Sequence, residues 1–454
     1  MRTVAMIGGG ASGSLAAVHL LRRAAGPLRV VLIDRDGRHG LGQAYATSDP
    51  AHLLNAGAVK MSAFDDDPGD LLRWARAEGM DVADGDYLPR AVYGRYLRSV
   101  LGRYRDRITE LTGNVVSLTP PAGGRPARLV LEDGSRVAAD AVVVATGNRT
   151  AAARTSGTNP RYVADPWSPG ALEPIRDGAP VLVVGTGLTM VDVAVTVTRA
   201  HPGTVVHAVS RHGLLPRPHR CTPAPPAEVA LPAGEVRLDR IFRAVMAAVR
   251  ANGGDWHAVV DGLRPRVPGL WEAFSADDKR RFLASLARYW EIHRHRIPPV
   301  TADRVDRLRA TGRLGVLRGS VTSAAADAGG VTVRLDGSGG PRELRVGWLV
   351  NATGPTRDLT ADPLLNDLFA SGAARRDPLD LGLEADACGS LLDLRGRPQP
   401  RLFTLGPTLR GQRYETTAVP EIRAQAAALA TALLASLEDE PALTPPEDHR
   451  AAAR

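Results

Sequence analysis

Glycines near the start of the chain stand at a spacing that could serve phosphate chemistry. An apolar run, Val4 to Ile7, is followed by Gly8, Gly10 and Gly13, and a helical pattern comes next. In a strand–turn–helix unit of this kind, the first glycine permits the tight turn and the second lets a pyrophosphate approach the backbone. The third lets the helix pack closely on the strand, and the helix N-terminus faces the phosphates. The spacing therefore predicts a dinucleotide site.

An acidic residue follows at the position that suits a ribose. A second apolar strand, Arg29 to Ile33, ends in Asp34, which stands 21 residues after Gly13. A carboxylate there can accept hydrogen bonds from a ribose diol. The alternative is a Rossmann-like turn that binds nothing.

The opening pattern recurs from Pro180, again as an apolar strand, Gly185 and Gly187, and a helix. Asp34 stands 26 positions after Gly8, and Arg211 stands 26 positions after Gly185. We therefore expect Ser210 and Arg211 at the structural position that holds Asp34 in the first unit. An acid suits a free ribose diol, whereas arginine beside a hydroxyl favours a 2′-phosphate. The pair of units predicts FAD in the first site and NADPH in the second, with the flavin accepting hydride.

Two Ala-Thr-Gly turns and a late helix complete the expected nucleotide sites. The first turn, at Thr146 and Gly147, is expected beside the first glycine turn, and the second, at Gly354, is expected to return the chain to the first sheet. A strand ends near Gly406, and a long helix begins near Pro420, so that its N-terminus can face the flavin. The residues expected to bind the cofactors are Gly8, Gly10, Ala11, Ser12, Gly13, Asp34, Arg35, Gln43, Asn55, Met61, Thr146, Gly147, Gly185, Gly187, Leu188, Thr189, Asp192, Ser210, Arg211, Gly354 and Gly406.

Composition bounds the class of protein. The chain has 454 residues, 44% of them hydrophobic and 23% charged, which is enough for two or three domains of ordinary globular type. No apolar run is long enough to span a membrane, and the N-terminus leaves no room for a signal peptide, so we expect a cytoplasmic protein. The two cysteines, Cys221 and Cys388, exclude a disulfide scaffold or a dithiol pair. The net charge of +8 is interspersed with acids, so nucleic acid is not expected as a partner.

The patterns predict an α/β fold with two Rossmann-like dinucleotide-binding domains, the second inserted in the first. We expect residues 1–165 and 346–437 to form the FAD-binding domain and residues 166–345 the NAD(P)H-binding domain, which carries a helical insertion at about 228–300. Residues 438–454 are expected to be a disordered tail. His293 and His295 lie two residues apart, which places them on different helix faces, so we expect no metal site.

Several strings together resemble a known family. They include IGGGASG, LLNAGAVKMSAF, SRHGLLPRPH, RYWEIHRHRIPP and YETTAVPEIRAQA, and they span almost the whole chain. The sequence resembles bacterial FAD/NAD(P)-binding proteins related to the flavin-dependent aspartate N-monooxygenase and the flavin-type urate hydroxylase. The resemblance implies FAD in the first site, a reduced nicotinamide in the second and, for some members, oxygen insertion at nitrogen or carbon. It does not fix the substrate.

The leading hypothesis is a monooxygenase that uses NADPH, FAD and O2 to oxidise a small polar substrate. Such a reaction needs a dry, shaped pocket and hydrogen-bond donors near the flavin rather than a side-chain nucleophile. Arg294 or Arg296 could pair with a substrate carboxylate, or could form an ordinary surface salt bridge. The alternatives are a reductase that passes electrons on without oxygen insertion and a nucleotide-binding redox sensor. A monomer or homodimer is expected, and the catalytic candidates are Asn55, Lys60, Met61 and Glu415.

Overall fold

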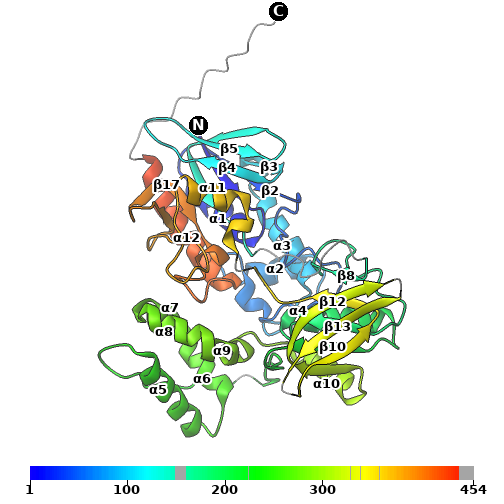
Figure 1. Cartoon of the computed structure of the whole chain (residues 1–454). Helices are drawn as coiled ribbons and strands as arrows, with labels where there is room; N and C mark the ends of the chain where they lie inside the picture. The colour runs from blue at the N-terminus through cyan, green and yellow to red at the C-terminus, as the bar shows by residue number, and fades with distance from the viewer. Residues whose placement is uncertain (149–159, 223, 328, 338, 357, 439–454) are drawn as a thin grey trace, which may run out of the picture.

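The computed structural model describes residues 1–148, 160–222, 224–327, 329–337, 339–356 and 358–438. These residues form a mostly parallel sheet of six strands, a parallel sheet of five strands and two antiparallel sheets of three strands each. Figure 1 shows the first sheet and its helices above, the second sheet with α10 below them, and a separate group of helices, α5 to α9, beside the second sheet. Most of the predicted disordered tail, residues 439–454, lies outside the described residues, but its first residue, Glu438, ends helix α12.

The first sheet has the strand order β16-β17-β7-β1-β2-β3 and is parallel except for β16. It consists of β1 (Arg2–Ile7), β2 (Leu28–Asp34), β3 (Ile108–Thr112), β7 (Ala141–Val144), β16 (Ser390–Leu392) and β17 (Pro398–Thr404). Its central strands are buried apolar runs, as expected of a parallel sheet covered on both faces. Helices α1 (Ala11–Arg23), α2 (Asp70–Ala77), α3 (Arg90–Gly102) and α12 (Val419–Glu438) cover one face, and α11 (Pro363–Ala370) lies on the other.

The second sheet has the order β11-β10-β9-β15-β8 and is parallel throughout. It consists of β8 (Tyr162–Val163), β9 (Val181–Val184), β10 (Val206–Ser210), β11 (Leu314–Arg318) and β15 (Trp348–Asn351), with α4 (Leu188–Ala200) and α10 (Pro299–Ala310) packed on one face. The expectation that the second Ala-Thr-Gly turn re-enters the first sheet is wrong. Strand β15, which leads into that turn, pairs with β9, because its apolar residues complete the second core.

The two nucleotide units share one topology. In each unit, three successive parallel strands are followed by an antiparallel meander and by a strand that returns beside the first. The meanders are β4 (Val115–Thr119), β5 (Ala127–Leu131) and β6 (Arg136–Ala139) in the first unit, and β12 (Ser320–Asp327), β13 (Gly330–Asp336) and β14 (Arg342–Val346) in the second. Each meander buries its apolar face on its own parallel sheet. The expected boundary at residue 346 therefore falls one strand too early, because β15 belongs to the second unit.

A helical segment lies between β10 and β11 and leads into α10. It contains α5 (Leu238–Ala251), α6 (Trp256–Leu263), α7 (Val267–Ala273), α8 (Ala276–Arg281), a π-helical turn (Phe282–Leu286) and α9 (Ala287–Arg294). Its apolar residues form two small clusters of their own, and one of these includes Tyr414 from the loop before α12. The segment is therefore anchored to the C-terminal part of the first unit (Figure 1).

The two nucleotide units are joined by a buried polar network. Arg90 at the start of α3 forms an ion pair of 2.8 Å with Asp192 of α4, and Asp192 is only 6% exposed. His52 Nε2 lies 2.8 Å from the Thr196 hydroxyl, and Asp49 accepts from Arg199 at 2.7 Å. Burial raises the pKa of Asp192, against the opposing effect of Arg90. This network fixes how the two sheets face each other.

Candidate dinucleotide sites

The first glycine turn has the geometry that its sequence predicts for a phosphate cradle. Gly8 has a φ of +113°, and a Cβ added there would lie 2.2 Å from the carbonyl oxygen of Ala145. A Cβ on Gly13 would lie 1.9 Å from the carbonyl oxygen of Gly8, so α1 can pack on β1 only without it. Helix α1 begins at Ala11, and its N-cap Gly10 makes no side-chain cap hydrogen bond. The amides of this first turn can therefore face a pyrophosphate, and the cradle fits FAD.

Asp34 lies at the end of β2, beside the glycine turn. One carboxylate oxygen accepts from the Gly9 amide at 3.1 Å, and the other accepts from the amides of Asp36 and Arg38. A Cβ on Gly9 would lie 2.7 Å from the Asp34 Cβ, which explains why the middle residue of the run Gly8-Gly9-Gly10 is also a glycine. The carboxylate thus uses three of its about four acceptor sites, and the remaining site, on the oxygen that accepts from Gly9, can accept from a ribose hydroxyl. Arg35 is exposed and pairs with Asp36.

The C-terminal part of the chain contributes to the same turn. Gly406 has a φ of +77°, and a Cβ there would lie 2.4 Å from the Ser12 hydroxyl oxygen. The Gly406 amide donates to Gln425 of α12 at 2.8 Å, and its carbonyl accepts from the Thr416 hydroxyl at 2.9 Å. Predicted residues that are almost 400 positions apart in sequence, Ser12 and Gly406, are thus in direct contact.

Three further predicted residues lie just after β7 or in the loop that follows β2. Thr146 and Gly147 follow β7, which pairs with β1, so both lie next to the glycine turn. Gln43 lies farther along, where its amide nitrogen is 3.4 Å from a carboxylate oxygen of Asp165. The sheet therefore gathers the ends of β1, β2 and β7 at one edge, where ligands bind in open α/β sheets.

The second glycine turn repeats the first in detail. Gly185 has a φ of +119°, and a Cβ there would lie 2.2 Å from the carbonyl oxygen of Ala352. The same distance separates a Cβ on Gly8 from Ala145, so each Ala-Thr-Gly turn packs on the first glycine of its own unit. Gly354 therefore belongs to the second site rather than to the flavin site. Helix α4 begins at Leu188, and its N-cap Gly187 also makes no side-chain cap hydrogen bond.

The register corrects the expected position of Arg211. Val184 of β9 pairs with Val209, as Ile7 of β1 pairs with Ile33. Ser210, not Arg211, therefore takes the place of Asp34, because the connection between the strands is one residue shorter in the second unit. The Ser210 hydroxyl lies 2.8 Å from the Thr186 hydroxyl. Arg211 follows immediately and is exposed at the end of the strand.

Three cations lie near this strand end, and the sequence revealed only one of them, Arg211. Arg318 stands opposite Ser210 at the end of β11. Burial and the positive charges of Arg288, Arg211 and Arg318 together lower the pKa of His212. Arg288 comes from α9 in the helical segment, which no spacing rule could place here. Three guanidinium groups therefore contribute positive charge beside this strand end.

Of the other predicted residues of the second helix, Leu188 and Thr189 lie in its first turn, and Asp192 has another partner. Leu188 packs partly against the core of the second unit, and Thr189 follows in the first turn of α4. Asp192, also predicted to bind the cofactor, has its carboxylate on Arg90 instead. We therefore propose that Asp192 holds the two units together.

The catalytic candidates of the early loop lie in a short 3-10 helix, Ala58–Met61, and the turn before it. Met61 is 4% exposed and packs in the first core. Lys60 is exposed, and the Asn55 carbonyl accepts from His219 Nε2 at 2.9 Å. Burial, together with the charges of Arg296 and Lys60, lowers the pKa of His219 to about 4. Asn55 and Lys60 therefore lie beside His219, in the connection between β10 and the helical segment.

Glu415 is 9% exposed and joins the helical segment to the first unit. Its carboxylate accepts from Trp290 Nε1 at 2.8 Å and from Arg294 Nε at 3.1 Å. Glu421, in the first turn of α12, accepts from Arg264 at 2.6 Å and from Arg294 at 3.3 Å. This four-charge cluster could not be found from spacing, because its members are far apart in sequence.

The two histidines at the end of α9 have separate partners. His295 Nε2 lies 2.9 Å from a carboxylate oxygen of Glu291, whereas the His293 ring stacks on Trp256 with a centroid distance of 5.0 Å. Arg296 pairs with Asp261 at 3.0 Å. Within the described ranges, no group of three His, Cys, Asp or Glu side chains gathers as metal ligands. In the same part of the chain, no helix is both long and apolar enough to cross a membrane.

Comparisons with known proteins agree with this geometry. Residues 5–149 match a family model described as FAD-NAD(P)-binding. The chain is 30% identical over 274 residues to an L-aspartate N-monooxygenase (nitrosuccinate-forming) from Streptomyces davaonensis, a match that covers 47% of this chain and 41% of the relative. A second such enzyme, from Streptomyces cremeus, is 28% identical over 275 residues and is matched over 40% of its length. The chain thus matches about two fifths of the length of these relatives.

Solved structures share the whole fold. An ornithine hydroxylase from Pseudomonas aeruginosa aligns with a TM-score of 0.65 at 16% identity, over 96% of this chain and 100% of its own. An L-lysine 6-monooxygenase from Pseudomonas syringae aligns with a TM-score of 0.68 at 15% identity, over 96% of this chain and 99% of its own. The predicted fold, with two dinucleotide-binding domains, is confirmed.

The match to the FAD-NAD(P)-binding model lies in the first unit and agrees with the predicted FAD and nicotinamide cofactors. By sequence, the chain is related to the flavin-dependent aspartate N-monooxygenases, as the resemblance implied.

Proposed function

We propose that this chain is an FAD-dependent monooxygenase that takes electrons from NADPH and inserts one oxygen atom into a small-molecule substrate with a polar head. The observation that supports it most is the pair of matching cradles at the carboxyl ends of two parallel sheets in one chain. The relation to the aspartate N-monooxygenases favours an amine as the group that is oxidised.

Each cradle would bind one cofactor through its own residues. The first turn of α1 and Asp34 would hold the pyrophosphate and a ribose of FAD, and Gly406, which has no side chain, would let its loop pack against Ser12 of that turn. The first turn of α4 would hold the pyrophosphate of NADPH, with Arg211 and Arg318 on its 2′-phosphate. A flavin bound in the first cradle would supply the redox chemistry, since a flavin can accept hydride and activate O2.

The remaining residues would shape the space in which oxygen is transferred. Asn55, Lys60 and Met61 lie on the early loop of the first unit, and we propose that Lys60 donates a hydrogen bond toward the substrate. Glu415 would be a positioning residue rather than a reacting one. Its two carboxylate oxygens accept hydrogen bonds from Trp290 and Arg294, and so keep Arg294 facing the loop before α12. Arg294 is then a candidate partner for a substrate carboxylate.

The test separates oxygen insertion from electron transfer. The purified, FAD-loaded protein is first reduced with NADPH under anaerobic conditions and is then mixed with ¹⁸O2 in the presence of L-aspartate or a panel of other amines. A monooxygenase converts one amine, one O2, one NADPH and one proton into one hydroxylamine, one NADP⁺ and one water, so the product gains a single ¹⁸O atom. Reduction followed by hydrogen peroxide alone with every amine would indicate a reductase. An absence of reduction by NADPH would contradict the proposal outright.

A further inference from the structure

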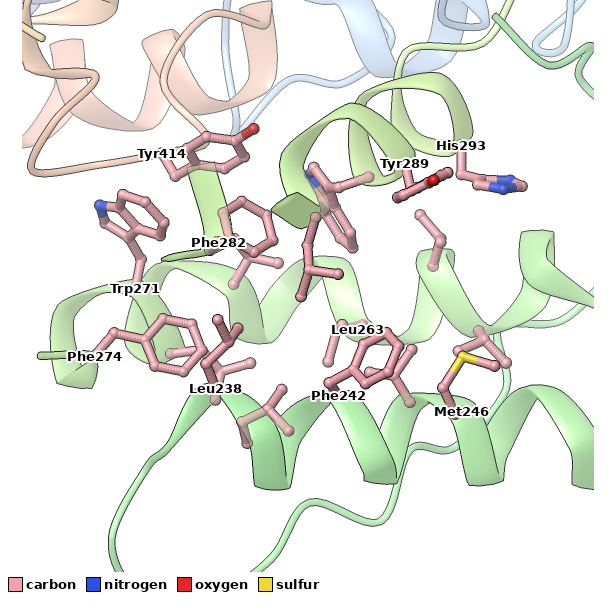
Figure 2. A pocket seen from close by; sticks show the side chains of 18 of the residues that line it. Leu238, Phe242, Met246, Leu263, Trp271, Phe274, Phe282, Tyr289, His293 and Tyr414 are labelled. Carbon is pink, nitrogen blue, oxygen red and sulfur yellow. The ribbon is translucent and has the colours of Figure 1, made fainter. Parts of the chain in front are cut away.

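Helix α9 has one side within the helical segment and another side beside the second nucleotide unit. Tyr289 and His293 lie on the side that lines an apolar cavity of the segment (Figure 2). Arg288 and Ile292 stand four positions apart and share the opposite side, which does not line that cavity. The Ile292 carbonyl accepts from the Arg217 amide at 2.9 Å. This side of α9 therefore lies beside the chain that follows β10.

The connection after β10 (residues 211–219) also contacts the second glycine turn. The Leu214 carbonyl and the Ser210 hydroxyl both lie within hydrogen-bond distance of the Thr186 hydroxyl, at 2.6 and 2.8 Å. Ser210 occupies the position that the ribose acid has in the first unit, and His212 stands two residues after it. His212 therefore marks the ribose end of the second site, on the same connection that is hydrogen-bonded to α9.

Arg288 adds a positive charge to this end of the site from outside the second sheet. Burial and, next, the charge of Arg288 lower the pKa of His212, and the charges of two further arginines, Arg211 and Arg318, lower it again. Among the residues that the structure describes, none of these three arginines forms an ion pair with a carboxylate. The Nη1 atom of Arg288 donates to the Ala284 carbonyl at 3.1 Å, which leaves its accessible Nη2 atom for a ligand. Unpaired guanidinium groups repel one another, so the cluster favours a bound anion.

We propose that Arg288 is a third ligand of the 2′-phosphate of NADPH, beside Arg211 and Arg318, so that the phosphate joins the helical segment to the second sheet. Planar guanidinium groups bind phosphate oxygens through paired hydrogen bonds. The C-terminal end of α9 is already held, because Arg294 pairs with Glu415 at 3.1 Å. The phosphate would hold the N-terminal end, since Arg288 lies six residues, or about 9 Å of helix, before Arg294. This role depends on the use of NADPH proposed above and not on oxygen insertion.

Two nucleotides that differ only in the 2′-phosphate, 2′,5′-ADP and 5′-AMP, test this role by calorimetry with the FAD-loaded protein. Arg288→Ala should weaken 2′,5′-ADP roughly ten-fold, because one charge-assisted contact is lost, and should leave 5′-AMP within about a factor of two. Arg288→Lys keeps the charge without the planar fork and should restore part of the difference. Arg250→Ala removes an exposed arginine of α5, in the same helical segment, and should change the binding of neither nucleotide.

Hydrogen exchange tests whether the phosphate also holds the helical segment. With each nucleotide at saturation, amides of the π-helical turn (Phe282–Leu286) and of α9 should exchange roughly three-fold or more slowly with 2′,5′-ADP than with 5′-AMP. In Arg288→Ala, the two nucleotides should protect these amides equally. Both nucleotides should still protect the first turn of α4, because both carry the 5′-phosphate that the glycine turn would bind.

The proposal is overturned if Arg288→Ala keeps the wild-type preference for 2′,5′-ADP, or if it weakens both nucleotides equally, since Arg288 would then only support the fold. It is also overturned if 2′,5′-ADP protects the ends of β10 and β11 but not α9. The FAD content verifies that each variant is folded, and Arg288→Gln, which keeps most of the side chain's packing, replaces Arg288→Ala if that variant loses FAD. Equal binding of both nucleotides to the wild type would contradict the use of NADPH, and this role with it. A failure of oxygen insertion alone would leave all these expectations in place.

Discussion

The preference for NADPH should depend on the two arginines at the strand ends of the second sheet. Arg211 follows Ser210 at the end of β10, and Arg318 ends the neighbouring strand β11 at the position paired with Ser210. Both guanidinium groups can therefore reach a phosphate on the ribose that lies over this strand end. The perturbation is Arg211→Ala and Arg318→Ala, made separately and together.

The magnitude follows from the number of charge-assisted hydrogen bonds that are lost. Each such bond contributes about 1.5–3 kcal/mol, and both arginines are exposed, so the lower figure applies. Each single substitution should then lower the NADPH-to-NADH ratio of efficiencies roughly ten-fold. The double substitution should lower it about a hundred-fold, provided that the two contributions add.

The assay is the anaerobic rate of flavin reduction at varied concentrations of NADPH or NADH, which reports binding of the nicotinamide without any substrate. Arg309→Ala is the matched control. Arg309 is an exposed arginine near the end of α10. Because α10 leads into the start of β11, Arg309 lies near the amino ends of the parallel strands, whereas Arg211 and Arg318 lie at their carboxyl ends. It should leave the ratio unchanged, and the selectivity of all variants should weaken with added salt. A ratio that stays within a factor of two of wild type in the double variant would refute the reasoning.

Three other predictions concern cofactor retention, stability and pH. Gly406→Ala should lower the FAD content of the purified protein several-fold, because the added Cβ collides with Ser12; Gly79→Ala has a similar φ, +80°, but open space around it, and should lose only backbone stability. Arg90→Leu should destabilise the protein by about 3–5 kcal/mol in urea unfolding, because it leaves Asp192 buried without its cation, and Arg90→Leu with Asp192→Leu should recover most of that loss. His219 has a pKa lowered from 6.5 to about 4, so it favours the folded state fully above pH 6.5 and loses this contribution as the pH falls toward 4; urea midpoints should decline over that window, and less steeply in His219→Gln.

The sequence predicted the cofactor cradles because they are local. Gly8, Gly13 and Asp34 lie within one strand–turn–helix–strand unit, where spacing alone sets the geometry, and the second unit follows the same rule. Gly406 could be placed only by its position after a strand, and its contact with Ser12 depends on how β17 joins the sheet. Counting misplaced Arg211 by one position, because the spacing rule assumes connections of equal length.

The rest of the site depends on tertiary packing that no spacing records. Arg288 of the helical segment lies close enough to His212 to lower its pKa, and the ion pairs of Arg294 with Glu415 and Glu421 join two parts of the chain more than 100 residues apart. The apolar stripes of the helical segment predicted helices, but whether such stripes fill their own core or enclose a cavity depends on how the helices pack.

The glycine turn and the residue that reads the ribose are coupled within each unit, and this coupling gives a further prediction. In the first unit, a Cβ on Gly9 would lie 3.1 Å from the Asp34 carboxylate oxygen that accepts from the Gly9 amide. In the second unit, the equivalent Thr186 has its hydroxyl 2.8 Å from Ser210, in the space that a carboxylate at position 210 would need. Ser210→Asp alone should therefore lose NADPH without gaining NADH, because its carboxylate is crowded by Thr186.

Combining Ser210→Asp with Thr186→Gly recreates the pair that the first unit uses for a free ribose diol. Flavin reduction by NADH should then become at least ten-fold more efficient than in Ser210→Asp alone, while Thr186→Gly by itself should mainly weaken both nucleotides. Equal use of NADH by the single and the double variant would show that the turn and the ribose position act independently. The acid at the end of the second strand would then be sufficient for NADH, whatever residue follows the first glycine.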